Sequence, residues 1–324
     1  MTRTLEEAPL RTRATDHLAV AVGTTKGLFL VSDGVADGPH FPGTEIPAFV
    51  QLDGRYLAAV VDPRVGSTIA WSDDGGMSWQ VRDSPSIAFP QESGDSVVRV
   101  WQLHRAATTS RNKRPVVFAG VEPAALFGSV DGGESFELVR SLWTQPDRES
   151  WSPGGGGLCL HTVLTHKDRP DRILVGISTG GVYRSEDGGR TFDASNEGIE
   201  ARLLGEPSPG HGQCVHKMAL DASGPDVAWL QNHWGVYRSD DGGRRWENVG
   251  RKGEDAGLPS DFGFPVVAHP VDHDTCFVYP LESDEYRCAA GARSRVYRTT
   301  DGGKHWEPLG RGLPQQGAHH CVLR

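Results

Sequence analysis

The chain has 324 residues, with 41 glycines, 21 prolines and only three methionines, a composition typical of a turn-rich β protein. Its formal net charge is −9, and the absence of a basic run argues against a nucleic-acid-binding protein. No apolar run is long enough to insert into a membrane, and five cysteines without framework spacing favour a reducing compartment, so we expect a cytoplasmic protein.

Residues 1–16 have no apolar core of a secretory signal and are predicted to be a disordered tail, followed by a single domain over residues 17–324. The domain opens with two short apolar strands, Leu18 to Gly23 and Gly27 to Val31. The second strand leads into the turn Ser32-Asp33-Gly34, a decayed copy of a pattern that recurs downstream.

That pattern is hydroxyl, any residue, Asp, Gly, Gly, any two residues, aromatic, and its copies are 54 to 60 residues apart. Asp-Gly-Gly favours a hairpin turn, because glycine accepts positive φ and the carboxylate can accept hydrogen bonds from the turn backbone. A carboxylate repeated around a fold is predicted to be structural rather than catalytic. The five central aspartates are Asp74, Asp131, Asp187, Asp241 and Asp301.

Each copy follows three β-rich segments and precedes a fourth, for example Cys214 to Leu220, Asp226 to Gln231, Gly235 to Ser239 and Trp246 to Val249. Four antiparallel strands per unit, repeated around an axis, form a propeller blade. The motif resembles the BNR or Asp-box repeat, and the chain resembles the propeller family of sialidases, sortilin-type receptors and photosystem assembly factors. The resemblance covers nearly the whole chain, but it implies little about function, because those relatives do unrelated things on one scaffold.

The predicted fold is therefore all-β: a six-bladed β-propeller of four-stranded antiparallel blades with Asp-box turns. The N-terminal blade lacks a first strand, and the C-terminal strand Ala318 to Leu323 is predicted to supply it, which avoids an exposed sheet edge. The alternative is a seven-bladed propeller whose last repeat is missing.

Because the Asp-box turns join third to fourth strands, the other connections lie on the opposite face. Those connections are long and irregular, as functional loops on a rigid scaffold usually are. The long loops are Asp83 to Ser96, Leu142 to Gly157, Gly198 to Gln213, Arg251 to Gly263 and Leu281 to Ser294. The run of four glycines from Gly154 to Gly157 suggests a mobile loop or a close backbone approach rather than a phosphate loop.

Polar side chains gather at the predicted starts of first strands on that face. Cys-x-His recurs at Cys159–His161 and Cys214–His216, where period-2 geometry places both residues on one side of the strand. We take His161, His216, Glu282 and Asp284 as candidate catalytic residues. The candidate ligand-binding residues are Arg99, Trp101, His104, His211, Lys217, His233, Trp234 and Arg287.

Two interpretations of the histidines stay open. In one, His161, His216 and His233 converge to bind a divalent metal or to polarise a substrate, since neutral imidazoles suit zinc, copper or iron. In the other, equivalent positions of neighbouring blades carry histidine because each packs and hydrogen-bonds alike between blades. Cys159 and Cys214 are more often small buried fillers than a redox pair. No cofactor is required by the sequence.

The repeat alone would suggest a sialidase, but the chemistry of that family is not supported. Sialidases with this repeat have a first arginine in an Arg-Ile-Pro-type segment, and Arg64-Val65-Gly66 is a poor substitute. Two hypotheses remain. One is a glycosidase-like or lyase-like enzyme that binds a small polar or carbohydrate-like ligand at the channel mouth. The other is a non-catalytic propeller serving as a binding or assembly module, with a protein as partner.

Overall fold

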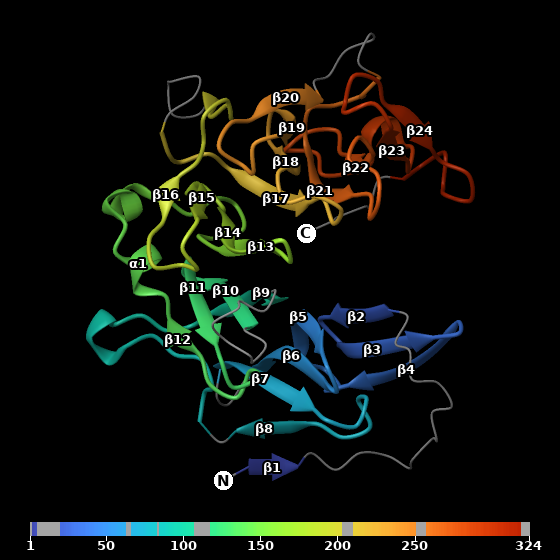
Figure 1. Ribbon diagram of the computed structural model, residues 1–324. Coiled ribbons are helices and arrows are strands. Elements are labelled where there is room, and N and C mark those ends of the chain that lie inside the picture. Colours follow the sequence, from blue (N-terminus) through green and yellow to red (C-terminus); the bar gives the residue numbers. More distant parts are fainter. Residues whose placement is uncertain are drawn as a thin grey trace. The chain divides into compact units, whose positions relative to one another are not determined.

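A computed structural model gives the structure of the chain and describes residues 2–4, 20–62, 66–82, 84–106, 117–202, 210–250 and 257–318. The described residues fall into two compact units, Met1–Trp143 and Thr144–Arg324, where the sequence predicted one domain over 17–324. Each unit contains antiparallel sheets that follow one another along the chain (Figure 1). The structure is all-β, as predicted, and the six sheets of the described residues are consistent with six blades.

The first unit holds three sheets. The sheet β2–β4 lacks a first strand of its own, as the sequence predicted, and another sheet has five strands instead of four because β1 pairs with β8. The sheets are β2 (Val20–Thr24), β3 (Gly27–Ser32) and β4 (Val35–His40); β1 (Thr2–Thr4), β8 (Gln80–Arg82), β7 (Gly66–Ser72), β6 (Arg55–Asp62) and β5 (Glu45–Leu52); and β12 (Glu137–Leu138), β11 (Ala125–Ser129), β10 (Val117–Glu122) and β9 (Arg99–Arg105).

The second unit holds three four-stranded sheets, each in simple chain order. They are β13 (Leu160–His166), β14 (Arg169–Ile177), β15 (Gly181–Ser185) and β16 (Asp193–Ala194); β17 (Val215–Leu220), β18 (Ala228–Asn232), β19 (Gly235–Ser239) and β20 (Glu247–Gly250); and β21 (Gly263–Ala268), β22 (Cys276–Pro280), β23 (Val296–Thr299) and β24 (Glu307–Leu309). Short helical segments lie between sheets or within loops: η1 (Gln91–Ser93), α1 (Arg140–Trp143), η2 (Pro146–Ser150) and η4 (Ala290–Ala292).

The chain termini bear on two of the predictions. Residues 2–4 of the predicted tail form β1, and the rest of that tail lies outside the described residues. Asp33 and Gly34 form the predicted turn between β3 and β4, both with positive φ. Of the predicted closing strand only Ala318 is described, and its N–H donates to the Ala292 carbonyl at 3.0 Å. Closure at six blades, against seven, stays a prediction.

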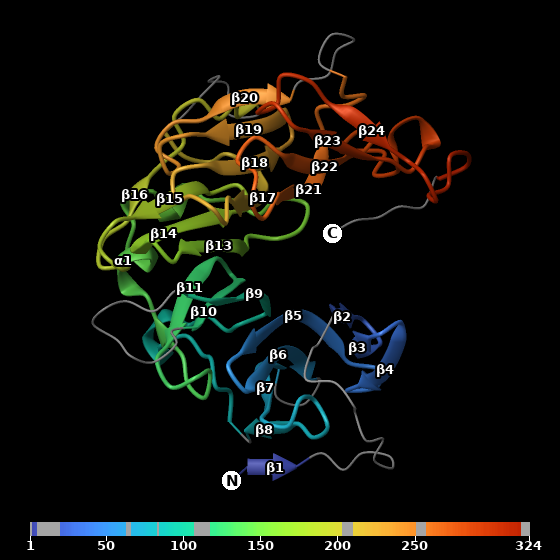
Figure 2. The same cartoon turned by 45° about the vertical axis from the view of Figure 1, so that its right-hand side comes forward.

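First strands of consecutive sheets pack on one another within each unit. In the second unit β13 contacts β17, and β17 contacts β21 (Figure 2). The hydrophobic core lies between neighbouring sheets: Leu174 and Val182 of one sheet pack with Met218, Leu230 and Tyr237 of the next. This packing gathers the starts of the first strands into one region, which positions the candidate site.

The five predicted Asp-Gly-Gly turns all form between third and fourth strands. In one of them the Asp241 carboxylate accepts hydrogen bonds from the Ser239 hydroxyl at 2.8 Å and from the N–H groups of Arg244 and Arg245 at 2.9 and 3.0 Å. Gly242 and Gly243 have φ of +73° and +84°, which glycine adopts without a Cβ clash. The aspartate therefore organises the turn, as the sequence predicted.

Hydrogen bonds also hold these carboxylates in the charged form. Burial would raise the pKa of Asp187, but hydrogen bonds from the Thr191 N–H and hydroxyl and from Ser185 outweigh it and lower the pKa to about 2. Asp301 behaves alike, with His305 and Thr299 as donors and a pKa of about 2. Because these folded-state pKa values lie below those of the unfolded chain, the turns contribute stability that is lost as the pH falls below about 4.

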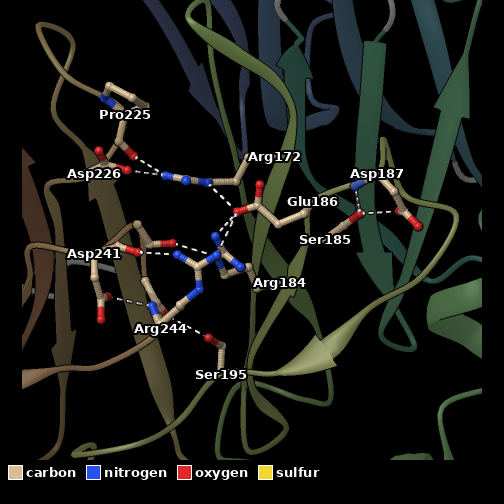
Figure 3. A network of polar contacts seen from close by, with 12 residues as sticks. Arg172, Arg184, Ser185, Glu186, Asp187, Ser195, Pro225, Asp226, Asp241 and Arg244 are labelled. Atoms are coloured by element: carbon tan, nitrogen blue, oxygen red, sulfur yellow. Dashed lines mark hydrogen bonds and ion pairs between the residues drawn. The ribbon is translucent and has the colours of Figure 1, made fainter.

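The Asp241 turn also contacts the preceding sheet. Trp246 is 3% exposed, and its Nε1–H donates to the Ser195 carbonyl at 2.9 Å. The Arg184 Nε–H donates to the Gly242 carbonyl at 2.8 Å. Figure 3 shows the arginines that join the two sheets: the buried Arg172 donates to Glu186 of its own sheet at 2.8 Å and to Asp226 of the next at 2.7 Å. This turn thus holds two neighbouring sheets together as well as ending its own hairpin.

Replacing Asp241 with alanine should lower the free energy of unfolding by about 2–3 kcal/mol, because three donors then lose a charged acceptor. Urea unfolding measures this change. Asp240→Ala is the matched control: Asp240 is exposed, and its partner Arg238 keeps a second carboxylate in Asp274, so the loss should be about 0–1 kcal/mol. Equal losses in the two variants would contradict the structural role of Asp241.

Candidate functional site

A β-bulge stands at the start of each first strand that carries a candidate residue. In β13, Leu160 pairs with Ile177 and Thr162 with Gly176, so His161 is left out of the ladder. His216 of β17 is left out between Val215 and Lys217 in the same way. Bulges re-aim side chains, often at functional sites. Both cysteines precede the strand. The side chains of Cys214 and His216 nevertheless lie close together, as the period-2 pattern predicted for that pair.

The bulged histidines link neighbouring first strands. The Nε2–H of His161 donates to the Val215 carbonyl at 2.8 Å, and the Nδ1–H of His216 donates to the Gly263 carbonyl at 2.6 Å. Burial, together with the nearby charge of Lys217, lowers the pKa of His161 to about 4. Burial and the charges of His233, His161 and Arg287 lower the pKa of His216 to about 3. Both imidazoles are therefore neutral at physiological pH.

Cys214, His216 and His233 form a cluster, in which one ligand atom from each lies within 4.8 Å of the others. The rings of His216 and His233 are 4.7 Å apart at their centroids. His233 follows the end of β18, where the hairpin turn brings it beside the start of β17. His161, which the sequence grouped with the two histidines as a metal candidate, is not in the cluster, and Cys214 takes its place.

The Cys214 thiol lies between two sheets. Burial raises its pKa to about 11, whereas a hydrogen bond with the Thr179 backbone and the charge of Arg287 act in the opposite direction. Thr179 belongs to the loop after β14, so the neighbouring sheet supplies the contact. Burial also lowers the pKa of His233, as does the charge of Arg287, while Asp284 opposes them.

Aromatic rings surround the cluster. Phe264 stacks on His216 with ring centroids 4.7 Å apart, and Phe262 meets the edges of both His216 and His233. The Arg287 guanidinium lies 5.4 Å from the centre of the Phe264 ring. These phenylalanines were not predicted as site residues. Phe264 is the second residue of β21, the position that histidine occupies in β13 and β17, so strand alignment was the signal that pointed to it.

Lys217 is a partly buried cation with a neutral partner. Its ammonium donates to the His161 carbonyl at 3.3 Å, and among the described residues it has no carboxylate partner. Burial lowers its pKa. An ammonium offers three donors, so two remain for other acceptors at the site.

The candidate carboxylates lie in the loop after β22. Glu282 is exposed, and its Oε2 accepts the Gly291 N–H at 2.7 Å, so it orders the turn around η4. Asp284 is 57% exposed and its Oδ2 lies 3.9 Å from Nδ1 of His233. The Arg287 Nε–H donates to the Asp284 carbonyl at 3.1 Å.

The four-glycine segment forms a tight turn beside this loop. The Gly157 N–H donates to the Gly154 carbonyl at 3.0 Å, and Gly157 has φ of +95°. A Cβ at Gly154 would lie 3.1 Å from the Ser178 hydroxyl, and one at Gly155 would lie 3.4 Å from the Arg287 guanidinium. The backbone of this segment therefore passes close to the Ser178 and Arg287 side chains.

The remaining candidates are divided between the two units. Arg99, Trp101 and His104 are on β9 of the first unit, where Trp101 is the bulged residue and its Nε1–H donates to Glu122 at 3.0 Å. Arg99 pairs with Glu45 and covers the Trp101 ring. In the second unit Trp234 touches His233 at 5.4 Å between ring centroids. No ring contact or hydrogen bond links His211 to the cluster within the described part of the chain.

Comparison with known proteins supports the fold. No family model matches the chain. Over 235 residues it is 30% identical to a probable oligoxyloglucan-reducing end-specific xyloglucanase of Neosartorya fischeri, a match that covers 67% of this chain and 24% of that enzyme. The chain thus spans about a quarter of the length of this curated relative.

Solved structures also include xyloglucanases among the similar folds. The GH74 xyloglucanase of Xanthomonas campestris superposes with a TM-score of 0.59 at 20% identity, covering 89% of this chain and 43% of that one. YCF48 bound to D1 peptide superposes with a TM-score of 0.52 at 13% identity, covering 90% and 79%. At these identities the likeness shows the fold alone and supports a β-propeller architecture. Among the described residues, no helix is both long and apolar enough to span a membrane.

The neutrality of His161 gives a testable prediction. Because burial lowers its pKa to about 4, the folded state binds fewer protons than the unfolded state between about pH 6.5 and 4. Its ring resonances should therefore stay unchanged in NMR spectra recorded from pH 7.5 to 5.5. His161→Gln identifies the resonance. A midpoint near pH 6.5 would contradict the buried hydrogen bond to Val215.

Proposed function

We propose that the chain binds a small, oxygen-rich ligand of the carbohydrate class at the starts of β13, β17 and β21, without cleaving it. The observation that carries this proposal is the partly buried ammonium of Lys217, whose partner is a single carbonyl. Leaving donors of a cation unfilled in a partly buried site costs free energy, which a ligand oxygen would recover.

Neighbouring side chains support the same ligand chemistry. Arg287 offers further guanidinium donors beside the cluster, and its stacking on Phe264 limits the entropy lost on binding. Trp234 and the phenylalanines supply the apolar faces on which sugar rings pack. The curated relative with 30% identity acts on oligoxyloglucan, which makes a saccharide the first class to test.

Glycoside hydrolysis is the second candidate, and the same relative favours it. Such hydrolysis needs a carboxylic acid with a raised pKa and a second carboxylate at a set distance. Glu282 and Asp284 are both exposed to solvent, and each already accepts a backbone N–H of its own loop. Their surroundings therefore favour binding over catalysis.

Three finer predictions accompany the proposed function. The fold is proposed to be a six-bladed propeller whose Asp-Gly-Gly turns are Asp boxes. A cytoplasmic location is proposed from the cysteine pattern. A protein partner is an alternative to the saccharide, since YCF48 has the same fold type and was solved with a peptide.

Binding is tested by calorimetry of the full chain with xyloglucan oligosaccharides and, in parallel, with uronate-containing oligosaccharides. Lys217→Met should weaken the binding at least tenfold, because a charged hydrogen bond of about 1.5–3 kcal/mol is lost. Lys167→Met is the matched control: Lys167 is exposed, pairs with Asp168 and should bind as the wild type does. Equal affinity of the Lys217 variant, or no binding of either oligosaccharide class at millimolar concentration, would overturn the proposal.

Catalysis is tested separately by incubating the protein with xyloglucan oligosaccharides and measuring new reducing ends. The wild type should release no more than the double variant Glu282→Gln, Asp284→Asn. Release by the wild type that the double variant abolishes would establish hydrolysis and refute a purely binding role.

A further inference from the structure

Cys214, His216 and His233 combine three soft or borderline ligand types at one place. In the part of the chain that the structure describes, they are the one group of three or more potential ligands whose atoms lie close enough together to hold a metal ion. All three side chains are partly exposed, so an ion can reach them from solvent. Their ligand atoms lie within 4.8 Å of one another, and side-chain rotation can bring them to the separation of about 3.5 Å found around a tetrahedral zinc ion.

The hydrogen bonds of His216 prepare its ring for coordination. A carbonyl oxygen only accepts, so the 2.6 Å contact with Gly263 places the proton on Nδ1 and leaves the lone pair on Nε2. Metal-binding histidines generally donate their other N–H in this way to a carbonyl or carboxylate. A carboxylate also stands near His233: the Oδ2 of Asp284 is 3.9 Å from its Nδ1, too far for a hydrogen bond.

We propose that Cys214, His216 and His233 bind a borderline-soft divalent cation, zinc first, with three protein ligands and one open coordination position. One thiolate and two imidazoles suit zinc, whereas calcium and magnesium require oxygen ligands. On binding, the Cys214 thiol releases its proton to solvent and the sulfur coordinates as the thiolate. Three protein ligands with an open fourth position distinguish catalytic or ligand-binding zinc sites from structural ones.

The preceding sheet shows why the site forms only once in the second unit. It has the same Cys-x-His at Cys159 and His161, and the same bulge. However, the turn after β14 consists of Ser178, Thr179 and Gly180 and has no histidine, whereas the turn after β18 carries His233. Both nitrogens of His161 are also occupied, one by Val215 and the other by the Thr162 hydroxyl at 3.0 Å. The inter-sheet hydrogen bond alone therefore explains His161, whereas His216 keeps a free lone pair beside two further ligands.

The matched residues allow a controlled experiment on the full chain. Protein freed of metal with a chelator is titrated with Co²⁺, whose thiolate charge-transfer and d–d absorption report a tetrahedral sulfur-containing site, and then with Zn²⁺ in competition. We expect one Co²⁺ per chain and displacement by Zn²⁺. Cys214→Ser should abolish the charge-transfer band, and His233→Ala should weaken binding about 10–100-fold.

Cys159→Ser and His161→Ala are the controls, and both should keep the cobalt spectrum. His233→Ala tests the site without touching the inter-sheet hydrogen bonds, and circular dichroism confirms that each variant is folded. Absence of a charge-transfer band in the wild type, or its survival in Cys214→Ser, would overturn the proposal. The titration contains no saccharide, so failure of saccharide binding and failure of metal binding are separate results.

Discussion

The carboxylate of the Asp-Gly-Gly turn is the constraint on which the rest of the structure depends. It accepts hydrogen bonds from its own turn, which fixes the tight reversal between the third and fourth strands of a sheet. The turn then presents its glycine carbonyls and its aromatic side chain to the preceding sheet. The eight residues of the motif, Ser239 to Trp246 in this copy, therefore set both the geometry of the hairpin and its packing on the preceding sheet. This coupling explains why the motif recurs while the residues between its copies vary.

Fixing the turns leaves the opposite ends of the strands free to vary. There the connections are longer, and each first strand begins with a bulge that removes one residue from the ladder. A bulged residue has no hydrogen-bonded partner on the neighbouring strand. A tryptophan or histidine can therefore stand at that position without loss of strand hydrogen bonds. In the second unit the bulges place two imidazoles against neighbouring strands. The scaffold thus provides equivalent positions, and the loops decide what surrounds each of them.

Much of this could be predicted from the sequence. The spacing of the aspartates predicted the turns and their structural role, and the segments before them predicted strands close to those observed. The sequence could not show the bulges, because a single extra residue does not disturb a hydrophobic pattern. It therefore placed Cys214 with Cys159 as a buried filler and His161 with the metal candidates. It also missed Phe262 and Phe264, whose rings matter only through contact with histidines far away in the chain.

Of the two interpretations of the histidines, packing between sheets and metal binding, both can hold at His216. A neutral imidazole has two nitrogens with different roles, one donating and the other accepting. His161 uses both nitrogens within the protein, so its role is complete in the packing of two strands. His216 uses Nδ1 in the same kind of inter-strand bond, and that bond leaves the lone pair on Nε2, in a residue that clusters with Cys214 and His233. A packing interaction shared by two sheets thus becomes the orienting contact of a ligand in one of them.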